Sequence, residues 1–256
     1  MTLYFVGLGI ANIKDISIRG LEVIKNSDII FLENYTSLFE SSIEEIEKFI
    51  EKKIFVLNRY DLEENYKKIL EIAKEKNVCI LTFGEPFFAT THIFLKNEAI
   101  KNNIKVEIIH SSCSFCSIFS FGISCYKIGK IITIPLKSKI SELPKSIYNY
   151  IKINKENKLH TICLLDIDVE RNEFLKPKDA LNFLIELENE FKENVINEED
   201  LVLVVSKIGF KDEKVYFGKI KKIKELEIEI PSIIILLSQL SSIEKESIEL
   251  ISKKYF

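Results

Sequence analysis

The fold is decided by one stretch, the apolar run Val78-Cys79-Ile80-Leu81-Thr82-Phe83 and the loop Gly84-Glu85-Pro86-Phe87-Phe88-Ala89-Thr90-Thr91-His92 that follows it. The run is short and apolar throughout, which is typical of a strand covered on both faces in a parallel sheet. The loop would then leave the carboxyl end of a central strand, where ligands bind in open α/β sheets. A plain connection from strand to helix also contains Gly, Pro and Thr, so both interpretations of the loop stay open.

Strand and helix patterns alternate on both sides of this stretch. The alternation predicts βαβ units and an α/β fold. Asp61 and Glu64 have the spacing of a capping box, which predicts one helix from there to Ala73. Small residues between phenylalanines predict a closely packed helix over residues 114–126. The other predicted strands are Leu3–Val6, Asp28–Leu32, Ile54–Leu57, Val106–Ile109, Ile131–Pro135, His160–Asp166, Leu201–Val205, Val215–Gly218 and Ile233–Leu237.

The charge balance and the apolar pattern exclude several classes of protein. The 256 residues include 36 basic and 39 acidic side chains, so no net positive charge favours sequence-independent binding of nucleic acid. No apolar span of membrane-crossing length is present, and Lys14 and Asp15 interrupt the first apolar stretch before it could serve as a leader. These features predict a soluble, cytoplasmic protein that binds neither a membrane nor nucleic acid.

The five cysteines are Cys79, Cys113, Cys116, Cys125 and Cys163. Their odd number and mostly apolar surroundings are typical of reduced thiols in a cytosolic protein. Cys113 and Cys116 form a C-x-x-C pair, but no second cysteine pair and no nearby histidine pair completes a tetrahedral site, so no metal is predicted. A redox dithiol is a weaker alternative for this pair.

The predicted strand-end loops contain few groups for acid–base chemistry. His92, His110 and His160 are far apart in the sequence, and each is predicted to be a hydrogen-bonded structural group. No nucleophile elbow, zinc-protease motif or phosphate-binding P-loop is present. Methyl transfer from the sulfonium of S-adenosylmethionine depends on alignment more than on proton transfer, and it suits such loops. We therefore expect positioning residues and assign no catalytic acid or base.

Six motifs occur together in a fixed order along the chain. They are Leu3-Tyr4-Phe5-Val6-Gly7-Leu8-Gly9, Ser17-Ile18-Arg19-Gly20-Leu21-Glu22, Glu33-Asn34-Tyr35-Thr36-Ser37, the Gly84–His92 loop, Lys127-Ile128-Gly129-Lys130 and His160-Thr161-Ile162-Cys163-Leu164-Leu165-Asp166. In this combination the chain resembles the diphthine synthase family, whose members have the tetrapyrrole-methylase fold. The loop G-[DE]-P-x-x-A-T-T-H with H-T-x-x-x-L-D is specific to this branch of the methylases.

The resemblance implies two α/β domains, residues 1–110 and 111–256, with S-adenosylmethionine in the cleft between them and S-adenosylhomocysteine as its product. It also implies a homodimer. The implied substrate is translation elongation factor 2, whose modified histidine carries a 3-amino-3-carboxypropyl group. This group is methylated repeatedly on its amino group and, in the eukaryotic branch of the family, on a carboxylate as well. Carried over by motif, the cofactor contacts are Ile10, Glu85, Phe88, Cys113, Ser114, Leu165, Ile208 and Ser232, several of them through backbone groups.

Several positions depart from the family pattern. Glu85 stands where Asp is usual, residues 110–114 replace a His-Asn/Ala-x-Ser-Ile pattern, and Ser232 stands where His is common. Two alternatives therefore stay open. One is a methyltransferase of the same fold that acts on a tetrapyrrole or on ribosomal RNA, although the balanced charge speaks against RNA. The other is a binding protein that has kept the fold but lost its cofactor.

Overall fold

The computed structural model describes residues 1–256. The chain divides into two compact units, Met1–Cys116 and Ser117–Phe256, here called unit 1 and unit 2. Both contain helices and strands, which confirms the predicted α/β class. None of the helices combines the length and the apolar character that crossing a membrane requires.

Unit 1 is built on a sheet of five parallel strands in the order β3-β2-β4-β1-β5. Strand β4 is buried at every position and lies between β2 and β1. Its continuous apolar run therefore marks a strand that is covered on both faces, as the sequence predicts. The strands are β1 (Thr2–Gly7), β2 (Ile29–Glu33), β3 (Phe55–Leu57), β4 (Val78–Thr82) and β5 (Lys105–Ile109).

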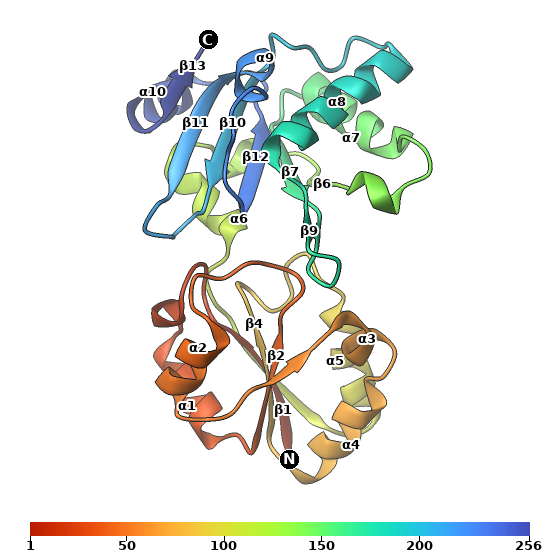
Figure 1. Cartoon of the computed structure of the whole chain (residues 1–256), viewed down its shortest axis with the longest axis vertical. Coiled ribbons are helices and arrows are strands. Elements are labelled where there is room, and N and C mark those ends of the chain that lie inside the picture. Colours follow the sequence, from red (N-terminus) through yellow and green to blue (C-terminus); the bar gives the residue numbers. More distant parts are fainter. The chain divides into compact units, whose positions relative to one another are not determined.

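Helices cover both faces of this sheet (Figure 1). Leu3 and Phe5 of β1 pack in the core cluster shared with the helices α3, α4 and α5, whereas Val6 packs in the cluster shared with α1 and α2. The alternation follows from the period of two along a strand. The helices are α1 (Ile18–Asn26), α2 (Ile43–Ile50), α3 (Arg59–Glu63), α4 (Lys67–Glu75) and α5 (His92–Lys101), with a 3-10 turn η1 (Ile13–Asp15) after β1.

The predicted helix from Asp61 to Ala73 is wrong in its start and in its continuity. The capping box lies three residues earlier. The Asn58 side chain accepts a hydrogen bond from the Asp61 N–H at 2.9 Å, and the Asp61 carboxylate accepts one from the Asn58 N–H at 3.1 Å. Asp61 is thus the third residue of α3, and a second helix, α4, begins at Lys67. A nearby Asn with the same capping chemistry displaced the predicted start.

Unit 2 contains a mixed sheet of six strands in the order β13-β11-β10-β12-β7-β6. Strand β12 is antiparallel to both β10 and β7, whereas β6 and β7 are parallel. The strands are β6 (Ile132–Ile134), β7 (Thr161–Leu165), β10 (Leu201–Ser206), β11 (Lys214–Lys219), β12 (Ser232–Leu236) and β13 (Lys253–Tyr255), and a hairpin is formed by β8 (Ile167–Asp168) and β9 (Glu173–Phe174).

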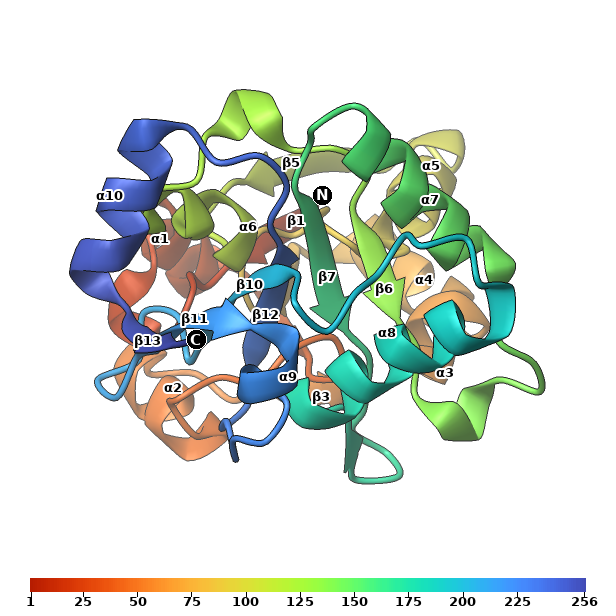
Figure 2. The ribbon, with the colours of Figure 1, turned by 90° about the horizontal axis from the view of Figure 1, so that it is seen from above.

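The core of unit 2 lies under two long helices, α7 (Lys145–Glu156) and α8 (Pro177–Phe191). Figure 2 shows these two helices near β6 and β7, with α10 (Ser242–Ile251) beyond β11 on the other side. Two shorter helical elements are α9 (Ile220–Ile223) and the 3-10 turn η4 (Lys137–Lys139).

The single helix predicted over residues 114–126 does not form. This segment contains α6 (Ser114–Ser117) and the 3-10 turns η2 (Ile118–Phe121) and η3 (Cys125–Lys127). Gly122, with a φ of 92°, ends η2 in a left-handed conformation that stops the helix. The serines that suggest close packing in the sequence belong to short turns.

Candidate cofactor-binding site

Five of the eight predicted cofactor contacts lie at one edge of the unit 1 sheet. Ile10 follows β1, Glu85 and Phe88 follow β4, and Cys113 and Ser114 follow β5. These three strands are parallel neighbours in the order β4-β1-β5. Their carboxyl ends therefore meet at the same edge, which is where α/β folds bind ligands.

The three loops approach one another closely at their glycine residues. The Gly84 N–H donates a hydrogen bond to the Gly9 carbonyl at 2.8 Å. A Cβ on Gly7 would lie 2.4 Å from the Gly84 carbonyl oxygen and 2.5 Å from the Ser111 Cβ, which no real side chain tolerates. Gly7, at the end of β1, is thus required because the loops after β4 and β5 pass too close for a side chain.

Glu85 links the loop after β4 to the loop after β5. Its carboxylate lies 2.8 Å from His110 Nδ1 and accepts a hydrogen bond from the Ser111 N–H at 3.0 Å. Both oxygens are thereby fixed in position. The sequence predicts Glu85 as a cofactor contact but gives no indication of its bond with His110, because the two residues belong to different strand ends.

The same edge carries an aromatic surface and hydroxyl groups without partners. The rings of Phe88 and Phe115 stack with centroids 5.1 Å apart. The Oγ1 atoms of Thr82 and Thr90 are buried and have no hydrogen-bond partner. Flat apolar rings beside free polar groups suit a ligand that combines a planar base with hydroxyl or amino groups.

Cys113 is buried within this edge, whereas Cys116 is exposed. Burial raises the pKa of the Cys113 thiol, which is therefore neutral rather than a reactive thiolate at neutral pH. A contact between this loop and a ligand would depend on its backbone and not on sulfur chemistry.

The remaining three predicted contacts lie together at one edge of the unit 2 sheet. Leu165 ends β7, Ser232 begins β12, and Ile208 follows the end of β10. The antiparallel register pairs Ser232 with Ser206, and the next residue along β12, Ile233, with Leu164. The fold of unit 2 therefore gathers residues that are separated by long stretches of sequence.

Asp166, which directly follows β7, has a structural role. Its carboxylate accepts a hydrogen bond from the Leu136 N–H at 3.1 Å and one from the Lys139 ammonium at 3.0 Å. Both partners belong to the loop after β6. Asp166 thus joins two neighbouring strand ends.

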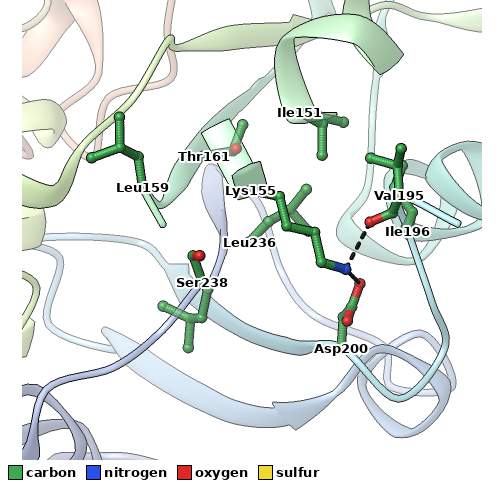
Figure 3. A pocket seen from close by; sticks show the side chains of 10 residues that line it. Ile151, Lys155, Leu159, Thr161, Val195, Ile196, Asp200, Leu236 and Ser238 are labelled. Carbon is green, nitrogen blue, oxygen red and sulfur yellow. Dashed lines mark hydrogen bonds and ion pairs between the residues drawn. The ribbon is translucent and has the colours of Figure 1, made fainter. Parts of the chain in front are cut away.

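Two hollows of unit 2 have linings that include none of the eight predicted residues. The smaller has a volume of about 20 Å³, and in its lining Lys155 donates hydrogen bonds to the Val195 carbonyl and to Asp200 (Figure 3). This volume suits one water molecule and not a nucleoside. The larger hollow, of about 660 Å³, is open and includes Leu136 and Phe183 in its lining.

A buried pair in unit 1 escaped prediction. Glu33 is fully buried and His92 is 2% exposed, and the Nε2 of His92 lies 3.9 Å from Glu33 Oε2. Both residues belong to quoted motifs, but the sequence gives no sign that the two motifs meet. The only available signal was the presence of Glu33 at the very end of an apolar strand, where a charged group needs partners.

Comparison with known proteins extends over nearly the whole chain. The sequence profile of the family described as Tetrapyrrole (Corrin/Porphyrin) Methylases matches residues 2–224. Diphthine synthase of Methanocaldococcus jannaschii is 39% identical over 222 residues, which cover 86% of each chain. Diphthine methyl ester synthase of Dictyostelium discoideum is 34% identical over 97% of each chain. A crystal structure of diphthine synthase superimposes with a TM-score of 0.89 at 30% identity and covers 99% of this chain and 97% of its own.

The chain therefore belongs to the tetrapyrrole methylase family and is an S-adenosylmethionine-dependent methyltransferase. Within that family its relatives are the diphthine synthases, which assigns it to diphthamide synthesis. The resemblance stated from the six motifs is confirmed.

Proposed function

We propose that this protein transfers methyl groups, more than once, from S-adenosylmethionine to the amino group of the aminocarboxypropyl-modified histidine of translation elongation factor 2. The observation that carries the proposal is the match with diphthine synthase over 86% of both chains. The presence of six family motifs in family order supports it. A homodimer is proposed on the same family grounds, and light scattering of the purified chain would test it.

The residues at the unit 1 edge fit the proposed cofactor. Two buried hydroxyl groups, Thr82 Oγ1 and Thr90 Oγ1, lack partners within the protein. Gly84 has a φ of 77°, a conformation that side chains rarely adopt, and a Cβ there would lie in ordinary contact with Cys113 at 3.6 Å. A buried polar atom without a partner is costly unless a ligand or water completes it. Such an edge would accept the ribose hydroxyl and amino groups of a nucleoside.

The proposed contacts are the eight carried over by motif. Ile10, Cys113 and Ser114 would act through backbone groups, and Phe88 with its stacked neighbour Phe115 would bind an apolar ring. Three further contacts belong to unit 2: Leu165, Ile208 and Ser232. The Ser232 hydroxyl already donates to the Glu229 carbonyl at 2.5 Å, which leaves the oxygen of Ser232 free to accept.

When bound, S-adenosylmethionine would supply an electrophilic methyl group on a sulfonium. The contribution of this chain would be to orient groups and to exclude water. Glu85 would hold its charge in one place, because His110 and the Ser111 N–H fix both of its oxygens. A fixed carboxylate beside a positively charged donor stabilises binding without reorganisation.

The test is methyl transfer to a defined acceptor. The full chain is incubated with S-adenosylmethionine that carries a labelled methyl group and with elongation factor 2 that carries the aminocarboxypropyl-histidine. We expect label in the elongation factor, added in successive methyl steps that mass spectrometry resolves. The matched control is elongation factor 2 with the unmodified histidine, which should gain no label.

Calorimetry with S-adenosylhomocysteine separates the ways in which the proposal would fail. Binding without any transfer to the modified elongation factor would reject this acceptor and point to another substrate of the same fold. Absence of both binding and transfer would mean that the chain has lost its cofactor.

A further inference from the structure

Two sequence motifs have no place in the proposed set of cofactor contacts. One is Glu33-Asn34-Tyr35-Thr36, which begins at the last residue of β2, and the other ends at His92, the first residue of α5. Both lie in unit 1, and their key side chains are buried. Buried charged and titratable groups are rare without a purpose, so the contacts of this cluster need an explanation.

Glu33 is held rigidly by its own loop. Its Oε1 accepts hydrogen bonds from the N–H groups of Tyr35 at 2.7 Å and Thr36 at 2.8 Å. Its Oε2 accepts a third bond from the Thr36 hydroxyl at 2.7 Å. Three donors from two consecutive residues fix the carboxylate, and Oε2 keeps a free lone pair 3.9 Å from His92 Nε2.

His92 in turn holds the loop that carries the proposed cofactor contacts. Its Nδ1 lies 2.7 Å from the Pro86 carbonyl oxygen. Since a carbonyl only accepts, Nδ1 must carry the proton and donate it. The imidazole is packed against Phe5 and Phe87, with ring centroids at 6.2 Å and 6.5 Å. Pro86 follows Glu85 directly and precedes Phe88 by two residues, so this one bond fixes the middle of the loop.

The other nitrogen of this imidazole is not explained by stability. His92 Nε2 is buried and has no hydrogen-bond partner, and 3.9 Å from Glu33 is too long for a direct bond. A core that was optimised for stability would place an apolar side chain here, because an unpaired buried nitrogen is unfavourable. The donor to Pro86 is what an apolar residue could not supply.

We propose that His92 is a positioning residue for the cofactor-binding loop. The imidazole donates a hydrogen bond from Nδ1 to the Pro86 carbonyl, and the loop thereby presents Glu85 and Phe88 in one arrangement. The inference rests on the proposed function, since it assigns His92 to the same cofactor site. Glu33 lies 3.9 Å from the other nitrogen of this ring, which places the Glu33–Thr36 motif next to His92.

Substitutions of different length test the bond with Pro86. His92→Asn keeps an N–H near the position of Nδ1, whereas His92→Leu removes both nitrogens and His92→Gln places its amide near the position of Nε2. We expect His92→Leu and His92→Gln to raise the Kd for S-adenosylhomocysteine by about tenfold, the loss of one good hydrogen bond. His92→Asn should restore the wild-type Kd to within about threefold. Ile93→Ala, at a half-exposed neighbour on α5, is the matched control and should bind as the wild type does.

Calorimetry and the melting temperature are measured on the same full-length variants. A merely structural role for His92 would lower the melting temperature and leave the Kd unchanged, and this outcome overturns the inference. An equal rise in the Kd of the Asn, Gln and Leu variants overturns it too, because the bond with Pro86 would then make no contribution to binding. If His92→Leu does not fold, the contrast between Asn and Gln decides alone. A wild-type chain that fails to bind S-adenosylhomocysteine refutes the proposed function and this inference with it, whereas normal binding by all variants refutes the inference alone.

Discussion

Each of the two units buries one histidine beside one glutamate, but only the pair in unit 2 is complete. His160 Nε2 lies 3.1 Å from Glu244 Oε1, and its Nδ1 accepts a hydrogen bond from the Ser238 N–H at 3.0 Å. His92 Nε2 lies 3.9 Å from Glu33 Oε2 and has no partner. Since buried polar atoms are nearly always paired, the difference separates a residue that stabilises its unit from one that has another task.

The two glutamates differ in the same sense. Glu244 accepts hydrogen bonds from the Lys127 ammonium at 2.7 Å and from the N–H groups of Ser241 and Ser124 at 2.8 Å and 3.1 Å. It joins α10 to η3 and to His160, which directly precedes β7. Glu33 bonds only within its own loop. His160 thus belongs to a network that connects several elements of unit 2. His92 instead bonds to the loop that carries the proposed cofactor contacts of unit 1.

The largest effect that would sharpen this comparison is the loss of Glu244. We expect Glu244→Ala to lower the free energy of unfolding by about 4 kcal/mol, because His160 and Lys127 lose a buried charged partner. Urea unfolding followed by circular dichroism measures it, and hydrogen exchange over Thr161–Leu165 locates the loss in unit 2. Glu246→Ala, at an exposed position of the same helix, is the control. A change no larger than that of the control would show that the network contributes little.

The pH dependence of stability is the second test. Burial alone would raise the pKa of Glu244, but the bonds from Lys127, Ser241 and Ser124 lower it to about 2. Burial also lowers the pKa of His160, against the opposing effect of Glu244. Both groups therefore bind fewer protons in the folded chain than in the unfolded chain. The stabilisation that each provides is complete above its pKa in the unfolded chain and is lost as the pH falls.

The loss should begin when the pH falls below the ordinary range of histidine. The contribution of Glu244 should then disappear between its unfolded pKa and about 2, and it amounts to about 3 kcal/mol. Urea midpoints recorded from about pH 7 to about pH 4 measure the first part of this decline. The Glu244→Ala chain should show a flatter profile, and an equally steep profile in that variant would assign the pH dependence to other groups.

The sequence predicts the strands of both units well because burial leaves a direct mark on composition. The run over Val78–Phe83 predicts a central parallel strand, and β4 is one. The motif order also predicts the family correctly. The starts of short helices were harder to predict from the sequence. Asn58 and Asp61 have the same capping chemistry, and only packing decides between them.

The pairing of the histidines could not be predicted. Each histidine lies beside a glutamate from a distant segment, His92 with Glu33, His110 with Glu85 and His160 with Glu244. Such contacts depend on strand order and register, and a single sequence does not specify these. The prediction that each histidine is a hydrogen-bonded group holds for all three, but it did not reveal the unpartnered nitrogen of His92.

A third test concerns the close packing at the unit 1 edge, in contrast to the charged network around Glu244 in unit 2. Gly7→Ala places a Cβ 2.4 Å from the Gly84 carbonyl oxygen and 2.5 Å from the Ser111 Cβ, so the loops after β4 and β5 must move apart. We expect a loss of about 2 kcal/mol in unfolding free energy, with weaker binding of S-adenosylhomocysteine. Unlike the loss in Glu244→Ala, this one should not change with pH. Ser112→Ala, on the same edge but exposed, is the control. A loss of unfolding free energy equal to that of the control would mean that the loops can accommodate a Cβ at residue 7.

The smallest expected effect concerns His110, the one histidine of the three that is exposed. Its ring lies 2.8 Å from Glu85 Oε1, yet its side chain is 75% exposed, so water competes for the bond and salt screens it. We expect His110→Ala to change the unfolding free energy by less than about 1 kcal/mol, far below the effect of Glu244→Ala. The Ser111 N–H would still hold the other oxygen of Glu85. The same urea titration measures this, and a loss as large as that of Glu244→Ala would show that burial is not what distinguishes the histidine pairs.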